Sequence, residues 1–283
     1  MDKKWTAVIK PKKKFLELNL REVYKYKDLI WLFVQRDIKT RYKQTVLGPL
    51  WFVIQPLLTS VIHTLVFGTI ANINPEGVPP YLFYLAGSIS WGLFSGCLTA
   101  TSNTFVGNAG VFGKVYFPRL TTPISTVITQ TFNFIIQFAI FLMMCLIFFL
   151  MGNSFQITWA AALLPLLMLQ LALLGLGCGI IISSLTTKYR DLQVLVGFGM
   201  QLWMYISPVV YDAKSIGGGK LYTAMMINPV SSILEIFKYG WLGPDAGSLP
   251  WLYWGISWIF TFAVLFFGIV IFNKIEKNFM DTV

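Results

Sequence analysis

The sequence predicts an all-α integral membrane protein with six transmembrane helices. Hydrophobic residues make up 56% of the 283 positions and charged residues only 12%, whereas soluble domains carry about 25% charged residues. The mean hydropathy is +0.67, and the longest stretch without Asp, Glu, Lys or Arg runs from Leu120 to Thr187. Such a chain has too little polar surface to cover itself in water, so an ordinary soluble globule is excluded.

Residues 1–46 form a predicted cytoplasmic basic tail that contains an N-terminal amphipathic interface helix. Thirteen of the 22 Lys and Arg residues precede position 45. Apolar residues recur in the second half of this tail at helical spacing, and charged residues gather on the opposite face, as in a helix that lies in the membrane surface. Lys27 and Asp37 interrupt the apolar face, so we expect the helix to bend or to meet a protein partner there.

Residues 47–275 form the predicted six-helix transmembrane domain. A span needs about 20 apolar residues. Uncharged stretches of that length predict helices at roughly 49–71, 81–105, two within 120–187, 192–211 and 246–273. Gly152-Asn153-Ser154 supplies the turn inside the long stretch, and residues 276–283 form a predicted cytoplasmic tail.

Residues 212–245 predict an external re-entrant helical hairpin between helices five and six. The uncharged run from Leu221 to Leu234 has only 14 residues and contains Pro229, so it is too short to span. Irregular backbone at membrane depth must be buried in protein or line an aqueous cavity. We therefore expect this segment to enter the membrane from the outer face and to return.

The basic residues predict the orientation. With six spans, 19 of the 22 Lys and Arg residues fall on the side of the N-terminus, and only Lys214, Lys220 and Lys238 fall on the other. Cytoplasmic segments of membrane proteins are enriched in Lys and Arg. Both termini are therefore expected in the cytoplasm.

Several function classes lack the residues that they need. No predicted span contains an interior Asp, Glu, Lys or Arg, which disfavours an ion-coupled carrier, and His63 favours hydrogen-bonded packing over a proton relay. Cys97, Cys145 and Cys178 are isolated and His63 is the only histidine, so we expect no metal site and no catalytic residue. The clustered basic charge favours anionic membrane lipid over nucleic acid as its partner.

Two patterns within the spans suggest packing or a path. Small residues form helical stripes, which predict close helix packing within the subunit or at a dimer seam: Ser88, Gly92, Gly96 and Ala100 on one helix, and Gly175, Gly179 and Ser183 on another. Seven aromatic residues are candidates to line a substrate path: Trp51, Phe52, Trp91, Phe94, Trp203, Tyr205 and Tyr211. In such a path their rings would stack on sugar faces or exclude water. Packing against lipid is an equal alternative for each of them.

Five strings then occur in a fixed order: Arg41–Trp51 (RYKQTVLGPLW), Lys114–Arg119 (KVYFPR), Tyr189–Leu192 (YRDL), Ser207–Tyr211 (SPVVY) and Asn228-Pro229. Together they resemble the polysaccharide-exporting permeases of the ABC type-2 transporter family. The similarity covers about residues 20–275. It is greatest to the O-antigen exporters, with capsule and teichoic-acid permeases as near relatives.

The resemblance implies a functional homodimer bound to two copies of a separate ATP-binding subunit. That subunit carries ATP and Mg²⁺, so this chain binds no cofactor. The implied substrate is a polysaccharide on undecaprenyl pyrophosphate, exported across the bacterial inner membrane. The implied channel is lined by the first and fifth helices of the two permeases and capped by the external hairpin.

The resemblance also assigns roles to cytoplasmic residues. It implies contacts with the ATP-binding subunit by Asp28, Asp37, Asn108, Lys114, Lys188, Arg190 and Asp191. Four basic residues at the cytoplasmic entrance are candidates to bind the pyrophosphate: Arg36, Lys39, Arg41 and Lys43. Cationic side chains pair well with phosphate oxygens. Binding of ordinary lipid head groups is the alternative.

Two other readings stay open. A membrane enzyme acting on polyprenyl-linked sugars would share the basic tail, but it should show an acidic cluster or metal ligands at the membrane face, which the sequence lacks. A small-molecule, drug or lipid exporter of the same superfamily differs in pore chemistry: a polymer path is wide and ringed by aromatics, whereas a lipid exporter has apolar lateral openings.

Overall fold

The computed structural model of the chain describes residues 20–42, 48–73, 75, 77–112, 117–186, 191–217 and 219–278. These residues form helices and their connections without any strand, as the sequence predicts. Five helical stretches among them are long and apolar enough to cross a membrane: Val53–Ile70, Pro80–Ser102, Thr121–Leu150, Trp159–Thr186 and Trp251–Phe272. They correspond to five of the six predicted spans.

These five spans have the following bounds. The first is α3 (Trp51–His63), which follows the single turn η1 (Gly48–Leu50) and continues as the π-helix η2 (Thr64–Ile70). The second and third are α4 (Pro80–Ser102) and α7 (Thr121–Leu150). The fourth joins η3 (Trp159–Leu163) to α8 (Leu164–Thr186), and the last is α12 (Trp251–Asn278), which runs into the predicted C-terminal tail.

The remaining predicted span is shorter than expected. Helix α9 (Leu192–Ile206) has 15 residues, about 22 Å at 1.5 Å per residue, whereas the hydrocarbon core of a bilayer measures about 30 Å. Ser207 has extended backbone because a proline, Pro208, follows it and disfavours the helical conformation. The expected helix up to Tyr211 is therefore wrong, and length alone supports five spans in the described part of the chain.

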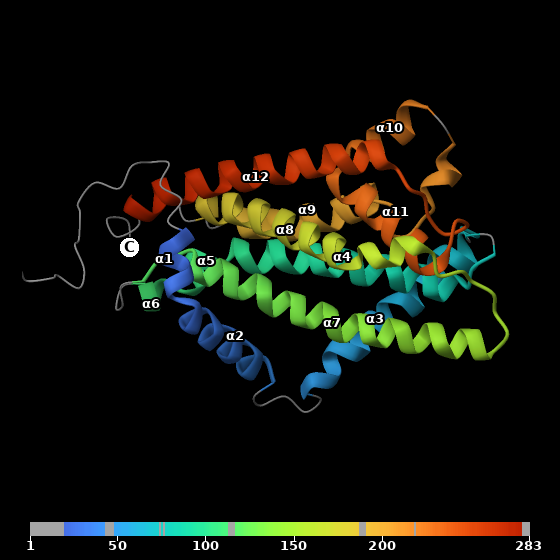
Figure 1. The fold of residues 1–283 in the computed structure, drawn as a ribbon, viewed down its shortest axis with the longest axis horizontal. Helices are drawn as coiled ribbons and strands as arrows, with labels where there is room; N and C mark the ends of the chain where they lie inside the picture. Colours follow the sequence, from blue (N-terminus) through green and yellow to red (C-terminus); the bar gives the residue numbers. More distant parts are fainter. Residues whose placement is uncertain are drawn as a thin grey trace, which may run out of the picture.

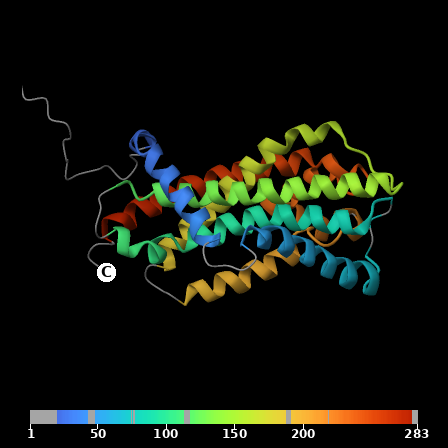
Figure 2. The same ribbon diagram turned by 90° about the horizontal axis from the view of Figure 1, so that it is seen from below.

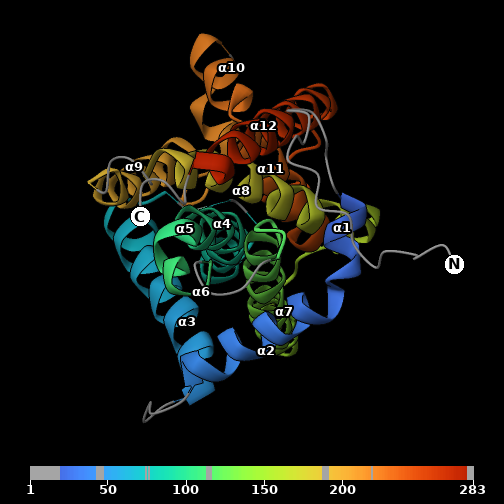
Figure 3. The same cartoon turned by 90° about the vertical axis from the view of Figure 1, so that its left-hand side faces the viewer.

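Helix α4 lies at the centre of the bundle, surrounded by α3, α7, α8, α9 and α11 (Figure 3). Of its most apolar window 72% is buried, against 22% for the windows of α3 and α12. A Cβ at Gly175 would lie 2.6 Å from the Cβ of Cys97, and one at Gly179 would lie 2.5 Å from the Cβ of Thr101. The stripe on α8 therefore brings its backbone against α4, and the close packing predicted for it is confirmed.

The connections gather at two ends of the bundle (Figure 1). Helices α1 (Leu20–Lys25), α5 (Thr104–Gly107) and α6 (Ala109–Phe112) lie at one end with the last turns of α12, and we call this the basic end. The connections 151–158 and 243–250 lie at the opposite end (Figures 1 and 2). Gly152, with φ at +87°, makes the predicted turn after α7, because only glycine readily adopts that conformation.

The N-terminal helix bends next to Lys27, as expected. Tyr26 forms a turn between α1 and α2 (Lys27–Tyr42), and α2 crosses α7 at the surface of the bundle (Figures 1 and 3). The ring of Trp31 lies 6.1 Å from that of Phe132, and the buried Phe33 lies 5.6 Å from Phe117. The apolar face of α2 thus packs against protein.

Two helices occupy the segment of the predicted hairpin. Following the turn η4 (Ala213–Ile216), α10 (Lys220–Ile227) and α11 (Pro229–Leu242) meet at Asn228, whose side chain accepts a hydrogen bond from Val230 N. Helix α10 stands away from the bundle, whereas α11 is buried against α4, α12 and η3 (Figure 3). Proline at the first position of α11 suits a helix start, because its missing N–H is not needed there.

Candidate functional site

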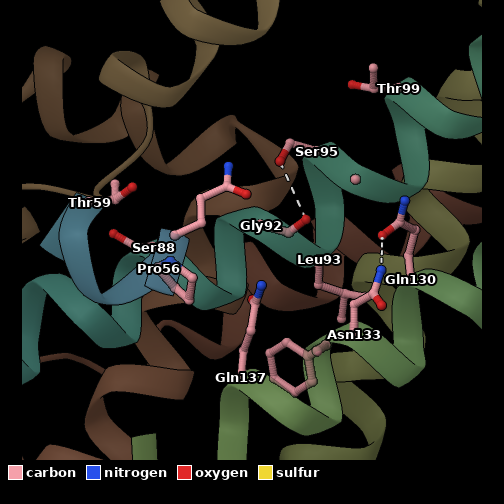
Figure 4. Close-up of a pocket in the computed structure, with 13 residues that line it drawn as sticks. Pro56, Thr59, Ser88, Gly92, Leu93, Ser95, Thr99, Gln130, Asn133 and Gln137 are labelled. Atoms are coloured by element: carbon pink, nitrogen blue, oxygen red, sulfur yellow. Dashed lines mark hydrogen bonds between the residues drawn. The ribbon is translucent and has the colours of Figure 1, made fainter. Parts of the chain in front are cut away.

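A polar cavity of about 360 Å³ lies between α3, α4 and α7 (Figure 4). It is open on one side and has no charged side chain in its lining. Four carboxamides line it: Gln55, Gln130, Asn133 and Gln137. Four hydroxyl groups also line it: Thr59, Ser88, Ser95 and Thr99. The cavity therefore presents a cluster of uncharged hydrogen-bond donors and acceptors between three of the apolar helices.

Helical spacing brings these side chains together. Gln130, Asn133 and Gln137 stand at i, i+3 and i+7 on α7, and therefore share one face. On α4, Ser88, Ser95 and Thr99 stand at i, i+7 and i+11, which again places them on one face, and on α3 the facing residues are one turn apart, at positions 55 and 59. Gln130 to Gln137 lie about 14 to 24 Å along α7 from its first residue. The cavity thus sits at the height of the middle turns of α7.

Glycines keep part of this space open. A Cβ at Gly96 would lie 3.2 Å from Oε1 of Gln130, and one at Gly92 would lie 3.7 Å from Oε1 of Gln137. Asn133 Nδ2 donates to Gln130 Oε1 at 2.7 Å (Figure 4). The stripe on α4 therefore faces carboxamide ends at these two positions rather than a helix backbone, which differs from close packing within the subunit, while packing at a dimer seam stays a prediction.

His63 lies behind one edge of the cavity. Its Nδ1 is 3.3 Å from Oγ of Ser88, and its ring packs edge-on against Phe67 and Tyr84 at 5.9 and 6.4 Å. The side chain is 8% exposed. This environment fits the hydrogen-bonded packing role that the sequence favours.

Three of the predicted path aromatics form one cluster on the other flank of α4. The ring of Phe94 lies 5.3 Å from Trp91 and 5.0 Å from Trp203 of α9. Trp91 and Phe94 are buried, and Trp203 Nε1 donates to Asn228 Oδ1 at 3.0 Å. Within one chain these rings therefore pack α9 on α4 and tie it to the α10–α11 joint.

The other path candidates lie apart from this cluster. Trp51 and Tyr205 are about half exposed, and the Tyr205 ring lies 6.4 Å from Phe67. Tyr211 lies beyond the end of α9, and its hydroxyl group donates to Ile206 O at 2.9 Å. The Phe52 side chain lies outside the described part of the structure.

At the basic end, α2 meets the connection after α4. Arg36 pairs with Asp37 at 2.8 Å, lies over the ring of Phe33 and reaches Asn108 Oδ1 at 3.5 Å. Two regions predicted to contact an ATP-binding subunit are therefore adjacent. Asp28, Lys39 and Asp191 are exposed. Lys43, Lys114, Lys188 and Arg190, together with the Arg41 side chain, lie outside the described residues.

Helix α11 carries two buried residues of opposite charge that the sequence did not indicate as buried; they influence each other electrostatically without a direct ion pair. Glu235 and Lys238 are both 0% exposed. Lys238 Nζ donates to Pro208 O at 2.5 Å and lies 3.8 Å from the centre of the Phe83 ring. Ser248 Oγ donates to Glu235 Oε2 at 3.0 Å, while Oε1 is buried without a hydrogen-bond partner among the described residues.

Desolvation dominates the titration of this pair. Burial raises the pKa of Glu235 above its ordinary range and lowers the pKa of Lys238, while each charge opposes the shift of the other. The prediction that Lys238 is a charge of an outer loop is wrong, because Lys238 lies on α11 with its side chain enclosed. The available signal in the sequence was that Glu235 and Lys238 stand at i and i+3, which places opposite charges on one face of a helix.

A second polar contact fixes α8 to α11 and α12. Gln170 is buried, donates to Ser257 Oγ at 2.8 Å and accepts from Trp254 Nε1 at 2.7 Å. Ser257 in turn donates to Pro229 O at 2.6 Å. Both ends of this carboxamide are thus bonded within the chain.

Within the described residues no group of His, Cys, Asp or Glu is placed to hold a metal ion. The cavity was also missed by the sequence analysis, which searched for formal charges in the spans. The spacing of the three carboxamides on α7 was the available signal.

The comparisons with known proteins agree with this architecture. The ABC-2 type transporter family model matches residues 28–242. The O-antigen export system permease protein RfbA of Klebsiella pneumoniae is 28% identical over 90% of this chain and 94% of its own length. RfbA of Myxococcus xanthus is 28% identical over 81% of this chain and 87% of its own, and the polysialic acid transport protein KpsM of Escherichia coli is 24% identical over 87% and 93%. The chain thus belongs to the ABC-2 type transporter family, as the resemblance of its motifs predicts.

Proposed function

We propose that this chain is the membrane-spanning permease subunit of an ATP-driven exporter for a lipid-linked polysaccharide. The substrate would be O-antigen-like, anchored on undecaprenyl pyrophosphate, and moved from the cytoplasm across the bacterial inner membrane. The observation that carries this proposal is the family match over residues 28–242, together with relatives named for polysaccharide export that align over most of their length.

The proposal includes a separate motor. ATP and Mg²⁺ bind the partner ATP-binding subunit, and this chain binds no cofactor. Its role is to convert the motion of two motor subunits into opening of a path. The contact between Arg36 of α2 and Asn108 after α4 supports this role, because force applied to α2 then reaches the central helix.

The proposed assembly is a homodimer of this chain with two ATP-binding subunits. The path runs between the two copies, along α3 and α9, which flank α4 and expose apolar side chains on their outer faces (Figure 3). In this arrangement α9 is the fifth of six spans, lengthened across the bilayer by the turns at 207–211, and α10–α11 is the outer re-entrant hairpin. Both termini are then cytoplasmic.

A capsular polysaccharide or teichoic acid is the alternative substrate. The similarity to the polysialic acid transport protein favours the capsular form of this alternative. A small lipid or drug substrate of the same superfamily is the third option. The relatives cited above supply no argument for it.

Two measurements test the proposal. The chain is co-purified with the ATP-binding subunit encoded with it, and ATP hydrolysis of the pair is assayed in lipid. Cells lacking the chain are examined for lipid-linked glycan. A 2:2 complex that hydrolyses ATP, together with glycan retained inside the cells, is the expected result, and a chain that binds no such subunit contradicts the proposal.

An Arg36→Ala variant sharpens the coupling part. It removes the contact with Asn108 and the pairing with Asp37. We therefore expect the complex to form, but its rate of ATP hydrolysis to lie closer to that of the ATP-binding subunit alone. Lys27→Ala, which changes an exposed basic residue of the same helix without an assigned role, is the matched control. Equal effects of the two variants would indicate a loss of general positive charge instead.

A further inference from the structure

We propose that the cavity between α3, α4 and α7 is a binding site for a neutral sugar unit. The inference rests on the proposed function, since it assigns part of the glycan substrate to this chain. The site lies on the flank of α4 opposite the Trp91, Phe94 and Trp203 cluster. It shares α3 with the proposed path, but its other walls are α4 and α7 rather than α9.

The unbonded carboxamides indicate a polar occupant. Gln170 shows what a structural carboxamide looks like in this protein, because both its nitrogen and its oxygen are bonded within the chain. Gln55, which is exposed, and the half-buried Gln137 form no hydrogen bond with the described residues, and Asn133 uses only its nitrogen, although its side chain is 7% exposed. Unpaired amides are unfavourable among apolar helices, so this cavity holds water or a polar ligand.

The chemistry of the walls suits a sugar. Carboxamides offer a donor and an acceptor each, and hydroxyl groups offer both in one atom, which matches the vicinal hydroxyls of a sugar ring. Leu93 and Phe134 add an apolar surface for the C–H face of the ring. The volume of about 360 Å³ falls at the lower end of the range of roughly 300 to 1,000 Å³ for small-molecule sites.

The absence of charge in the lining selects a neutral ring. Among the described residues no Lys, Arg, His, Asp or Glu lines the cavity, and His63 lies behind Ser88. A uronic or sialic acid would place a carboxylate there without a counter-charge, which is strongly unfavourable. The cationic Arg36 lies on α2, where it pairs with Asp37. The cavity therefore recognises hydroxyl groups, and phosphate or carboxylate is excluded from it.

The test uses a neutral glycolipid that carries a photoreactive group. Octyl glucoside with a diazirine on its alkyl chain is cross-linked to the full-length chain in lipid nanodiscs, with and without the ATP-binding subunit, and labelled peptides are mapped by mass spectrometry. Labelling should fall on α3, α4 and α7. Unmodified octyl glucoside should compete, whereas octyl glucuronide, which is anionic, should not.

Variants separate binding from folding. Gln137→Leu removes an unbonded carboxamide and should lower labelling about tenfold, the loss expected for about one hydrogen bond. Gly96→Leu should reduce it by filling the space next to Gln130. Gln156→Leu, in an exposed connection outside the cavity, is the matched control and should label like the wild type. Complex formation with the ATP-binding subunit reports that each variant is folded.

Three outcomes overturn the inference: unchanged labelling in both cavity variants, equal competition by the glucuronide, or labelling that no sugar displaces, which would leave water as the occupant. Failure of the proposed function is distinguishable from these. A chain that binds no ATP-binding subunit yet shows sugar-specific labelling in nanodiscs would contradict the exporter assignment alone. A working complex with unaffected labelling would contradict the sugar site alone.

Discussion

Polar groups inside this apolar bundle occur in two regions that treat them differently. Around α11, Glu235, Lys238 and Gln170 are fully enclosed and most of their polar atoms are bonded within the chain. In the cavity beside α4, the exposed Gln55 and the half-buried Gln137 have no hydrogen-bond partner among the described residues. The first region is built as part of the fold, and the second is built to receive something. Variants of matched chemistry should therefore have opposite consequences in the two places.

The largest effect is expected for Lys238→Met. The substitution keeps most of the side-chain volume but leaves Glu235 buried without its counter-charge, so we expect the free energy of unfolding to fall by about 3 to 5 kcal/mol. Thermal unfolding in detergent measures this change. The double variant Glu235→Gln, Lys238→Met should recover most of the loss. If it is as unstable as the single variant, packing rather than charge is responsible.

Two glycines allow a comparison of close packing. A Cβ at Gly247 would lie 2.4 Å from Glu235 O and 2.5 Å from Tyr239 N, both backbone atoms, so Gly247→Ala should destabilise by about 1 to 3 kcal/mol. Gly96→Ala meets only the flexible end of Gln130, at 3.2 Å, and should change stability by less than about 0.5 kcal/mol. Unfolding midpoints of the two variants check this. Equal losses would mean that the cavity wall is as rigid as α11.

The stability of Lys238→Met should also depend on pH. Because burial raises the pKa of Glu235 and no counter-charge opposes it in the variant, the folded state keeps a proton that the unfolded state releases above its ordinary pKa of 4.5. Stability is then greatest below that value, and it falls by up to about 1.4 kcal/mol per pH unit as the pH rises toward the raised pKa. Unfolding measured across this window shows the slope. A flat profile in Lys238→Met would show that Glu235 is solvated.

The last comparison uses a matched pair of carboxamides, of which Gln137 should show almost no effect on stability. Gln170→Leu loses two hydrogen bonds and should cost about 1 kcal/mol for each. Gln137→Leu loses none to the described residues and should leave the stability nearly unchanged while it lowers sugar labelling. Unfolding and labelling are measured on the same samples. A stability loss in Gln137→Leu equal to that in Gln170→Leu would make the cavity carboxamides structural.

The sequence predicted much of this architecture because missing charge is a strong signal in a membrane protein. It placed five spans close to their observed positions, the bend beside Lys27 and the turn at Gly152. It overestimated α9, because Pro208 is uncharged and passed as part of an apolar run. The length of a charge-free stretch limits a helix, whereas local backbone chemistry determines where it ends.

The candidate site was harder to predict for the same reason. Gln130, Asn133 and Gln137 carry no formal charge, so a search for ionisable groups passed over them. Glu235 and Lys238 carry charge but follow an uncharged run, which suggested a surface loop, and only their tertiary surroundings show that both are enclosed. The aromatic residues were identified, but their distribution between core and surface depends on which helices pack around α4.

The central position of α4 also bears on how the protein is made. Its most apolar window has a mean hydropathy of 1.3, the lowest of the five candidate spans, whereas α7 reaches 2.5 and α8 reaches 2.3. The glycines that accept α4 lie on α8, which the ribosome synthesises later. During biogenesis α4 therefore leaves the translocon as the least lipid-soluble segment before its main partner exists. Its retention in the bilayer depends on neighbours still to come, so chain truncations before α8 should leave α4 poorly inserted.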